Sequence, residues 1–122
     1  MNLQTVLEKF SVISNIEIDN CSKWIPICSE SIEEIKNNLK SGVNENENAH
    51  RLETAAAALS LYKYTLYSSA NMTAQSFSAG ELRIKTNPDK CVKMAQKAWI
   101  EARNSISDLL KDESFVFERI TY

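Results

Sequence analysis

Apolar residues recur at intervals of three and four along four segments of the chain, the spacing that places them on one face of a helix. In residues 3–14 this face is formed by Leu3, Val6, Leu7, Phe10 and Ile13. A helix this short gains its stability from docking onto the rest of the protein. The segment therefore predicts an amphipathic helix that packs against a core.

The second segment has the most regular pattern, with apolar residues at Cys21, Trp24, Ile25, Cys28, Ile32, Ile35 and Leu39. Asp19 is a suitable N-cap for a helix here, and Gly42 is a suitable stop. Pro26 conflicts with one continuous helix, because proline removes a hydrogen bond and clashes with the preceding turn. We expect either a kink at Pro26 or a helix that begins near Ile25.

The third segment follows a polar linker at residues 41–48 and predicts a helix over about residues 47–70. Its apolar stripe consists of Leu52, Ala55, Ala56, Leu59, Tyr62 and Leu66. The four consecutive alanines at 55–58 allow a neighbouring backbone to approach closely. We therefore expect this helix to lie at the centre of the fold.

The fourth segment opens with Asn87 and Pro88, a typical N-cap followed by a proline at the first helical position. The pattern predicts a helix that runs to about Lys111. Its expected inward-facing residues are Cys91, Met94, Ala95, Ala98, Ala102, Ile106, Leu109 and Leu110.

Two shorter segments favour extended structure. Within an extended loop at about 71–86, Leu82 and Ile84 alternate with charged residues as in a half-exposed strand, and residues 114–122 are rich in phenylalanine and β-branched residues. The two segments either pair with each other inside the chain or reach out to the edge of a neighbouring subunit. The expected fold is a single mainly α domain over residues 1–122, with a four-helix core and a minor two-stranded β element.

Composition narrows the class of protein. A chain of 122 residues with 43% hydrophobic and 25% charged residues has the make-up of one ordinary globular domain. The net charge of −2 gives no overall attraction to nucleic acid or anionic lipid. No apolar run is long enough to span a bilayer, and Glu8 and Lys9 interrupt the place of a signal peptide. We expect a soluble protein in the cytoplasm, with reduced cysteines.

The residues that usually carry chemistry do not form a site. His50 is the only histidine, and Cys21 and Cys28 lie about two helical turns apart, too far for a shared zinc or a disulfide. The acidic pairs Glu33–Glu34 and Glu45/Glu47 occupy a polar helix face and a linker, which favours solvated carboxylates. We expect no enzymatic activity, no metal and no cofactor, and interpret the chain as a domain that binds protein.

The order of these parts resembles the small helical head–tail connector (adaptor, or head-completion) proteins of tailed bacteriophages and prophages. A short first helix is followed by CSKWIPICSESIEEIKNNL, then by the Ala- and Tyr-rich RLETAAAALSLYKYTLY. A polar loop leads into SFSAGELRIK, and a long last helix ends near KAWIEARNSISDLL. The most telling part is the third segment followed by Phe77, Ala79, Gly80 and Ile84.

The resemblance implies a structural protein of the virion, assembled in the bacterial host cytoplasm. Its subunits would form a ring that docks to the portal protein and to a tail-side connector protein. DNA would pass through the ring without sequence-specific binding, along the acidic side chains Glu33, Glu34, Glu45 and Glu47. The alternative interpretation is a cytoplasmic helical adaptor or regulator that binds one host protein.

The resemblance also assigns the protein interfaces to the two extended segments. The expected interface residues are Phe77, Gly80, Leu82, Arg83, Ile84, Phe115, Phe117, Ile120 and Tyr122.

Overall fold

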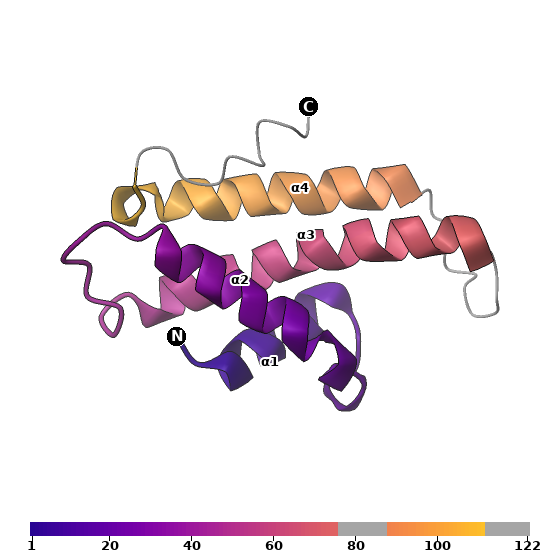
Figure 1. Cartoon of the computed structure of the whole chain (residues 1–122), viewed down its shortest axis with the longest axis horizontal. Helices are drawn as coiled ribbons and strands as arrows, with labels where there is room; N and C mark the ends of the chain where they lie inside the picture. The colour runs from indigo at the N-terminus through magenta and orange to yellow at the C-terminus, as the bar shows by residue number, and fades with distance from the viewer. Residues whose placement is uncertain (76–87, 112–122) are drawn as a thin grey trace.

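The structure is a computed structural model that describes residues 1–75 and 88–111, with side chains for 1–68 and 90–111. This part of the chain folds into four α-helices, as the sequence predicts: α1 Leu3–Ser14, α2 Ile25–Asn37, α3 Ala49–Gln75 and α4 Pro88–Ser105 (Figure 1). Three short 3-10 turns lie at Ile18–Asn20, Ser22–Trp24 and Ser107–Leu109.

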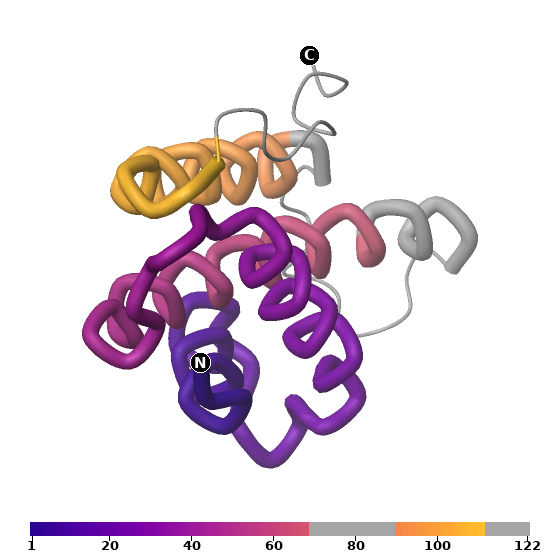
Figure 2. Tube along the Cα trace, turned by 60° about the vertical axis from the view of Figure 1, so that its left-hand side comes forward, coloured from indigo at the N-terminus to yellow at the C-terminus, as the bar shows by residue number. Residues whose placement is uncertain are grey.

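Helix α3 is the central element and contacts each of the other three helices. Helix α4 runs along one side of α3, and α1 and α2 pack on the other side (Figures 1 and 2). The four alanines at 55–58 are all buried, so the small side chains lie where three helices approach one backbone. The expected central position of this helix is confirmed.

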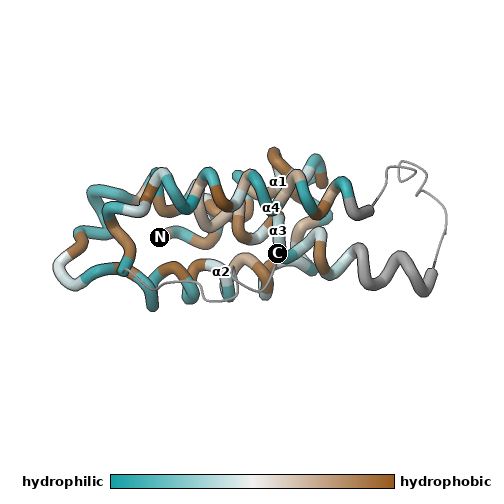
Figure 3. Tube along the Cα trace, turned by 90° about the horizontal axis from the view of Figure 1, so that it is seen from above, coloured by the Kyte–Doolittle hydropathy of each residue, from teal (hydrophilic) through white to brown (hydrophobic). Residues whose placement is uncertain are grey.

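The hydrophobic core gathers around the first half of α3. Figure 3 shows apolar and polar positions alternating along the helices, and the apolar positions that meet at α3 form the core. Its largest fully buried side chains are Trp99, Tyr62, Phe10, Ile35, Leu52, Leu59, Ile106 and Val6. Burial of side chains of this size contributes about 1.5–3 kcal/mol each.

The first two helices form where the pattern predicts them, but parts of their predicted apolar faces are exposed, with Leu3 at 36%, Ile13 at 47% and Ile25 at 37%. Residues 3–14 form α1 as predicted, and its N-cap Asn2 accepts a hydrogen bond from the backbone of Thr5. Helix α2 begins at Ile25 and places Pro26 in its first turn, where no hydrogen bond is lost. The second of our two expectations for Pro26 is therefore confirmed. Asp19 is not the N-cap, since it lies in a separate 3-10 turn.

Three predictions for α3 and α4 are wrong, two about which side chains are buried and one about where α4 ends. Leu66 and Met94 are exposed, at 43% and 64%, although the pattern places both inward. Trp99 is fully buried and absent from the predicted inward set, because that set follows a phase shifted by about one residue. Helix α4 ends at Ser105 instead of Lys111, and the chain continues in a 3-10 turn.

Arg51 caps the carboxyl end of α4. Its guanidinium donates to the backbone oxygen of Ser105 at 2.7 Å and to both carboxylate oxygens of Asp108, at 2.7 and 3.5 Å. A cation is favourable at a helix carboxyl terminus, where backbone carbonyls lack partners. The hydrogen bond from Arg51 also lowers the pKa of the Asp108 carboxyl.

The segments that follow α2 and α4 meet in an antiparallel bridge between Leu39 and Leu110. The backbone N–H of Lys40 donates to Leu109 at 2.9 Å, and that of Lys111 donates to Asn38 at 2.8 Å. The two strands predicted from sequence, around 82–85 and 114–122, lie outside the described residues.

The α3–α4 hairpin is much longer than the helices that cover it. At 27 residues α3 spans roughly 40 Å, whereas the 13 residues of α2 span about 20 Å. The hairpin consequently projects beyond α1 and α2 (Figure 1). We call the outer part of this hairpin, residues 63–75 of α3 with 88–94 of α4, the arm. Its first turn still contacts the other helices, through Lys63 to Glu34 of α2 and through Tyr64 to Phe10 of α1. The remainder of the described chain is the base.

Candidate interaction surfaces

The acidic residues expected to line a channel differ in their surroundings. Lys63 donates to the carboxylates of Glu34 at 2.7 Å and Glu30 at 3.0 Å, which ties α2 to α3. Glu34 is therefore part of an internal ion pair and only 26% exposed, while its neighbour Glu33 is exposed on the outer face of α2. Of this pair, only Glu33 is placed to meet another molecule.

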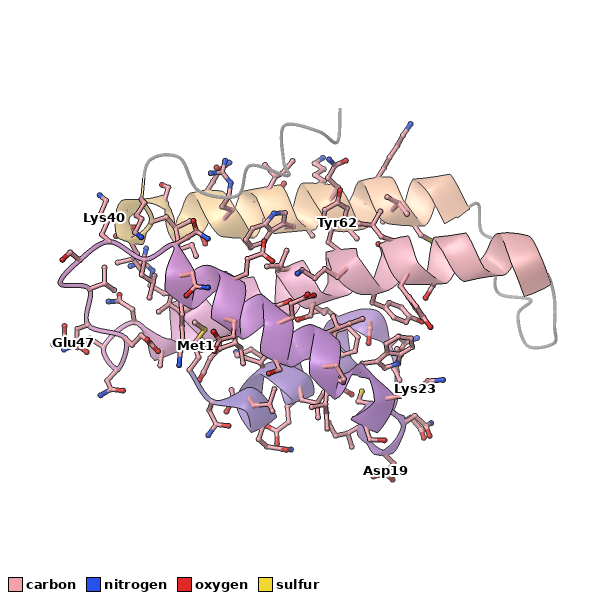
Figure 4. All side chains as sticks on the ribbon, viewed as in Figure 1. Met1, Asp19, Lys23, Lys40, Glu47 and Tyr62 are labelled. Carbon is pink, nitrogen blue, oxygen red and sulfur yellow. The ribbon has the colours of Figure 1, made fainter. Side chains whose placement is uncertain are left out.

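The linker carboxylates show the same contrast. The amino-terminal ammonium of Met1 donates to Glu45 at 2.9 Å, and this hydrogen bond lowers the pKa of Glu45. Glu47 is exposed at the end of the base far from Asp19 (Figure 4). The structure thus commits Glu34 and Glu45 to contacts inside the chain and leaves Glu33 and Glu47 on the surface.

The interface residues expected from the extended segments all lie outside the described part of the chain. They are Phe77, Gly80, Leu82, Arg83 and Ile84 in residues 76–87, and Phe115, Phe117, Ile120 and Tyr122 in residues 112–122. Their assignment stays a prediction.

An aromatic cluster that is not predicted from the sequence lies where the base meets the arm. The ring of Trp24 packs edge-to-face against Tyr64 at 4.8 Å and against Tyr67 at 5.6 Å between centroids. Tyr67 is 55% exposed, Trp24 is half-buried, and the ammonium of Lys23 lies 5.3 Å from the Trp24 ring centroid. The spacing of Tyr64 and Tyr67 on α3 was the available signal, because residues three apart share a helix face.

The outer face of α4 forms a second exposed surface. Met94 and Ile100 are 64% and 38% exposed, and Lys90, Lys93 and Lys97 are exposed around them. These residues point away from α3, since Ala95 and Trp99 occupy the packed face of the same helix. Met94 and Ile100 are the exposed large apolar side chains of this otherwise charged face.

The groups that could support chemistry are placed as structural or surface residues. Burial raises the pKa of the Cys28 thiol, which disfavours the reactive thiolate. Cys21 is also buried, and no disulfide joins the three cysteines. His50 is exposed, with its Nδ1 3.5 Å from the ammonium of Lys9. Among the described residues, no group of three His, Cys, Asp or Glu side chains could hold a metal ion.

Comparisons of the chain with protein-family models, with curated proteins and with solved structures found no match. None of the helices in residues 1–75 and 88–111 is long and apolar enough to cross a membrane.

Proposed function

We propose that the chain is a structural subunit of a phage or prophage head–tail connector, which acts by self-assembly and by docking to the portal and tail-side connector proteins. The observation that carries this proposal is the projecting arm. The hairpin is covered on one side by α1 and α2 at its base, and further out the other described helices leave faces of α3 and α4 exposed, as at Leu66, Tyr67 and Met94. Such faces are available to neighbouring subunits.

The order of parts along the chain supports the same proposal. The four helices follow one another in the order of the connector-like pattern, and residues 76–87 connect α3 to α4. In the proposed ring this loop and residues 114–122 supply a minor two-stranded β element. Their interface residues contact an adjacent subunit or the portal.

The proposed DNA passage rests on the acidic surface. Exposed carboxylates at a channel wall repel the phosphate backbone, so that DNA slides without binding. Glu33 and Glu47 are the stronger candidates for this role, because Glu34 and Glu45 already form ion pairs within the chain. The ring would form in the host cytoplasm and remain in the virion.

The alternative is a helical adaptor or regulator that binds one host protein. The aromatic cluster of Trp24 and Tyr67 favours this adaptor interpretation, because tryptophan and tyrosine are enriched at the centres of protein interfaces. In both readings the chain binds protein and performs no enzymatic reaction.

Light scattering across a concentration series, with and without a portal protein, tests the proposal. A ring-sized species, or a monomer that assembles only when the portal is added, is the expected result. A stable monomer or dimer that is indifferent to the portal would favour the adaptor and contradict the connector.

Truncation after Lys111 probes the terminal segment separately. We expect the truncated chain to retain its helical circular dichroism and to lose assembly. Global unfolding of the truncated chain would instead show that the terminal aromatic residues belong to the core.

A further inference from the structure

We propose that copies of this chain contact one another head-to-tail, with the outer face of α4 of one copy on the α2 side of the next. The inference rests on the self-assembly in the proposed function and adds which two surfaces meet. Its occupant is a second copy of this chain, and three features of the described residues lead to it.

The first feature is the basic character of the outer face of α4. Positions 90, 93, 94, 97, 100 and 101 lie on one face of this helix, because they follow one another at steps of three and four. All six are exposed, and they present three lysines, one glutamate, Met94 and Ile100. The face therefore combines a positive charge with two apolar side chains that a partner can cover.

The second feature is the acidic character of the opposite side. On α2 and the turns before it, Glu17, Asp19, Glu30 and Glu33 are exposed, against Lys23 and Lys36, and Lys63 already pairs with Glu30. In this contact Glu33 lies between two copies, which leaves Glu47 as the exposed candidate for the channel wall. The apolar part of this side is the first turn of α2 with the adjoining aromatic cluster, where Ile25 is 37% and Tyr67 is 55% exposed. This side carries the complementary charge and an aromatic surface onto which a methionine packs favourably.

The third feature is the position of the two faces on the molecule. Helix α4 lies on one side of α3 and α2 on the other, and Asp19 and Lys23 project from the far side of α3 relative to α4 (Figure 4). A contact between two different faces leaves one of each free on the resulting pair, so further copies can add. A contact between two copies of the α4 face would instead place lysines against lysines.

Two charge-reversed chains test this contact. One chain carries Lys93→Glu and Lys97→Glu on α4, and the other carries Asp19→Lys and Glu33→Lys on the α2 side. All four positions are exposed, so the helical circular dichroism of each chain should match that of the unchanged protein. Each chain alone should need at least about tenfold higher concentration for half-complete assembly, because like charges then face each other across the contact.

Mixing the two reversed chains is the decisive step. In an alternating assembly, each reversed face meets the reversed face of the other chain, and each unchanged face meets an unchanged one. Assembly should therefore return in the equimolar mixture to near the concentration that the unchanged chain requires. The variant Lys40→Glu, which reverses an exposed charge just before the linker, is the matched control and should assemble normally.

The outcomes separate this contact from the proposed function. If the unchanged chain assembles and either reversed chain assembles equally well alone, or the mixture fails to recover, the head-to-tail contact is wrong and the connector proposal stands. If the unchanged chain neither assembles at any concentration nor responds to the portal, the connector proposal fails and the contact fails with it.

Discussion

The base and the arm each contain a part of α3 and a part of α4, and these two parts differ in what surrounds them. In the base, α3 is covered by α1 and α2 on one side and by α4 on the other, and Leu52, Leu59 and Trp99 are fully buried. From residue 63 onward every described side chain of α3 is at least partly exposed, and on α4 Met94 is 64% exposed. In this hairpin, a residue can therefore belong to a helix without belonging to the core.

The difference has an energetic meaning. Leu52 and Leu59 of the base are removed from water completely, whereas Leu66, Tyr67 and Met94 of the arm are 43%, 55% and 64% exposed. We therefore expect substitutions in the base to change stability and substitutions in the arm to change association. The following predictions test that division, from the largest effect to the smallest.

Trp99→Ala should have the largest effect. Trp99 is the largest fully buried side chain, and truncation of a buried aromatic residue to alanine costs about 3–5 kcal/mol of unfolding free energy. Urea denaturation followed by circular dichroism measures this loss. Met94→Ala, on the exposed face of the same helix, is the control and should cost less than about 1 kcal/mol. Equal losses for the two variants would contradict the distinction between base and arm.

Ala56→Leu should destabilise the base by overpacking. Ala56 is fully buried on α3, and added methylene groups in a close-packed interior cost about 1–3 kcal/mol. Thr54→Leu adds a similar bulk at an exposed position of the same helix and should leave the urea midpoint almost unchanged. A neutral Ala56→Leu would mean that the helices do not approach closely at this position.

Trp24→Ala should lower the free energy of unfolding by an intermediate amount, about 1–2 kcal/mol. Trp24 is half-buried, and its edge-to-face contacts with the tyrosine rings contribute about 0.5–1.5 kcal/mol in addition to the burial of its surface. A double-mutant cycle with Tyr67→Ala separates the contribution of this ring pair. A loss as large as that of Trp99→Ala would place Trp24 in the core instead of at its border.

Glu45 should make the smallest contribution, and it should depend on pH. The pKa of Glu45 is lowered in the fold by the hydrogen bond from the amino terminus, so its stabilising effect is complete above its ordinary value of 4.5. The effect is lost as pH falls from 4.5 through the lower pKa of the folded state. Because the pair is partly solvated, Glu45→Gln should cost less than about 1 kcal/mol at pH 7 and nothing at the acid end. Unfolding curves of both chains at several pH values check this convergence.

The helices could be predicted from sequence because their apolar spacing and their proline residues are local signals. Pro26 and Pro88 both mark the first turn of a helix, and the stripe from Leu52 to Tyr62 is buried as expected. Which side chains are covered beyond that stripe depends on the lengths of α1 and α2, which local spacing does not reveal. The pattern therefore predicts Leu66 as inward, although none of the described helices covers it, whereas Met94 is predicted inward because the predicted face of α4 differs in phase from the packed one.

The candidate surfaces were less accessible to sequence reasoning for a related reason. The Trp24–Tyr67 contact joins residues far apart in the chain, and the ion pairs of Glu34 and Glu45 join each to a partner on another element. From the sequence alone, all of these acidic side chains are expected to be solvated. In the fold, some of them form ion pairs within the chain and the others remain exposed at the surface. The remaining expectations concern the extended segments, which lie outside residues 1–75 and 88–111.

The Leu39–Leu110 bridge also determines how the domain would carry mechanical load. A pull on the chain beyond Lys111 acts first on two backbone hydrogen bonds, from Lys111 to Asn38 and from Lys40 to Leu109. Lys63 in turn joins α2 to α3 by its ion pairs with Glu30 and Glu34. The bridge and these ion pairs therefore connect the last described residues to the central helix by a route other than α4.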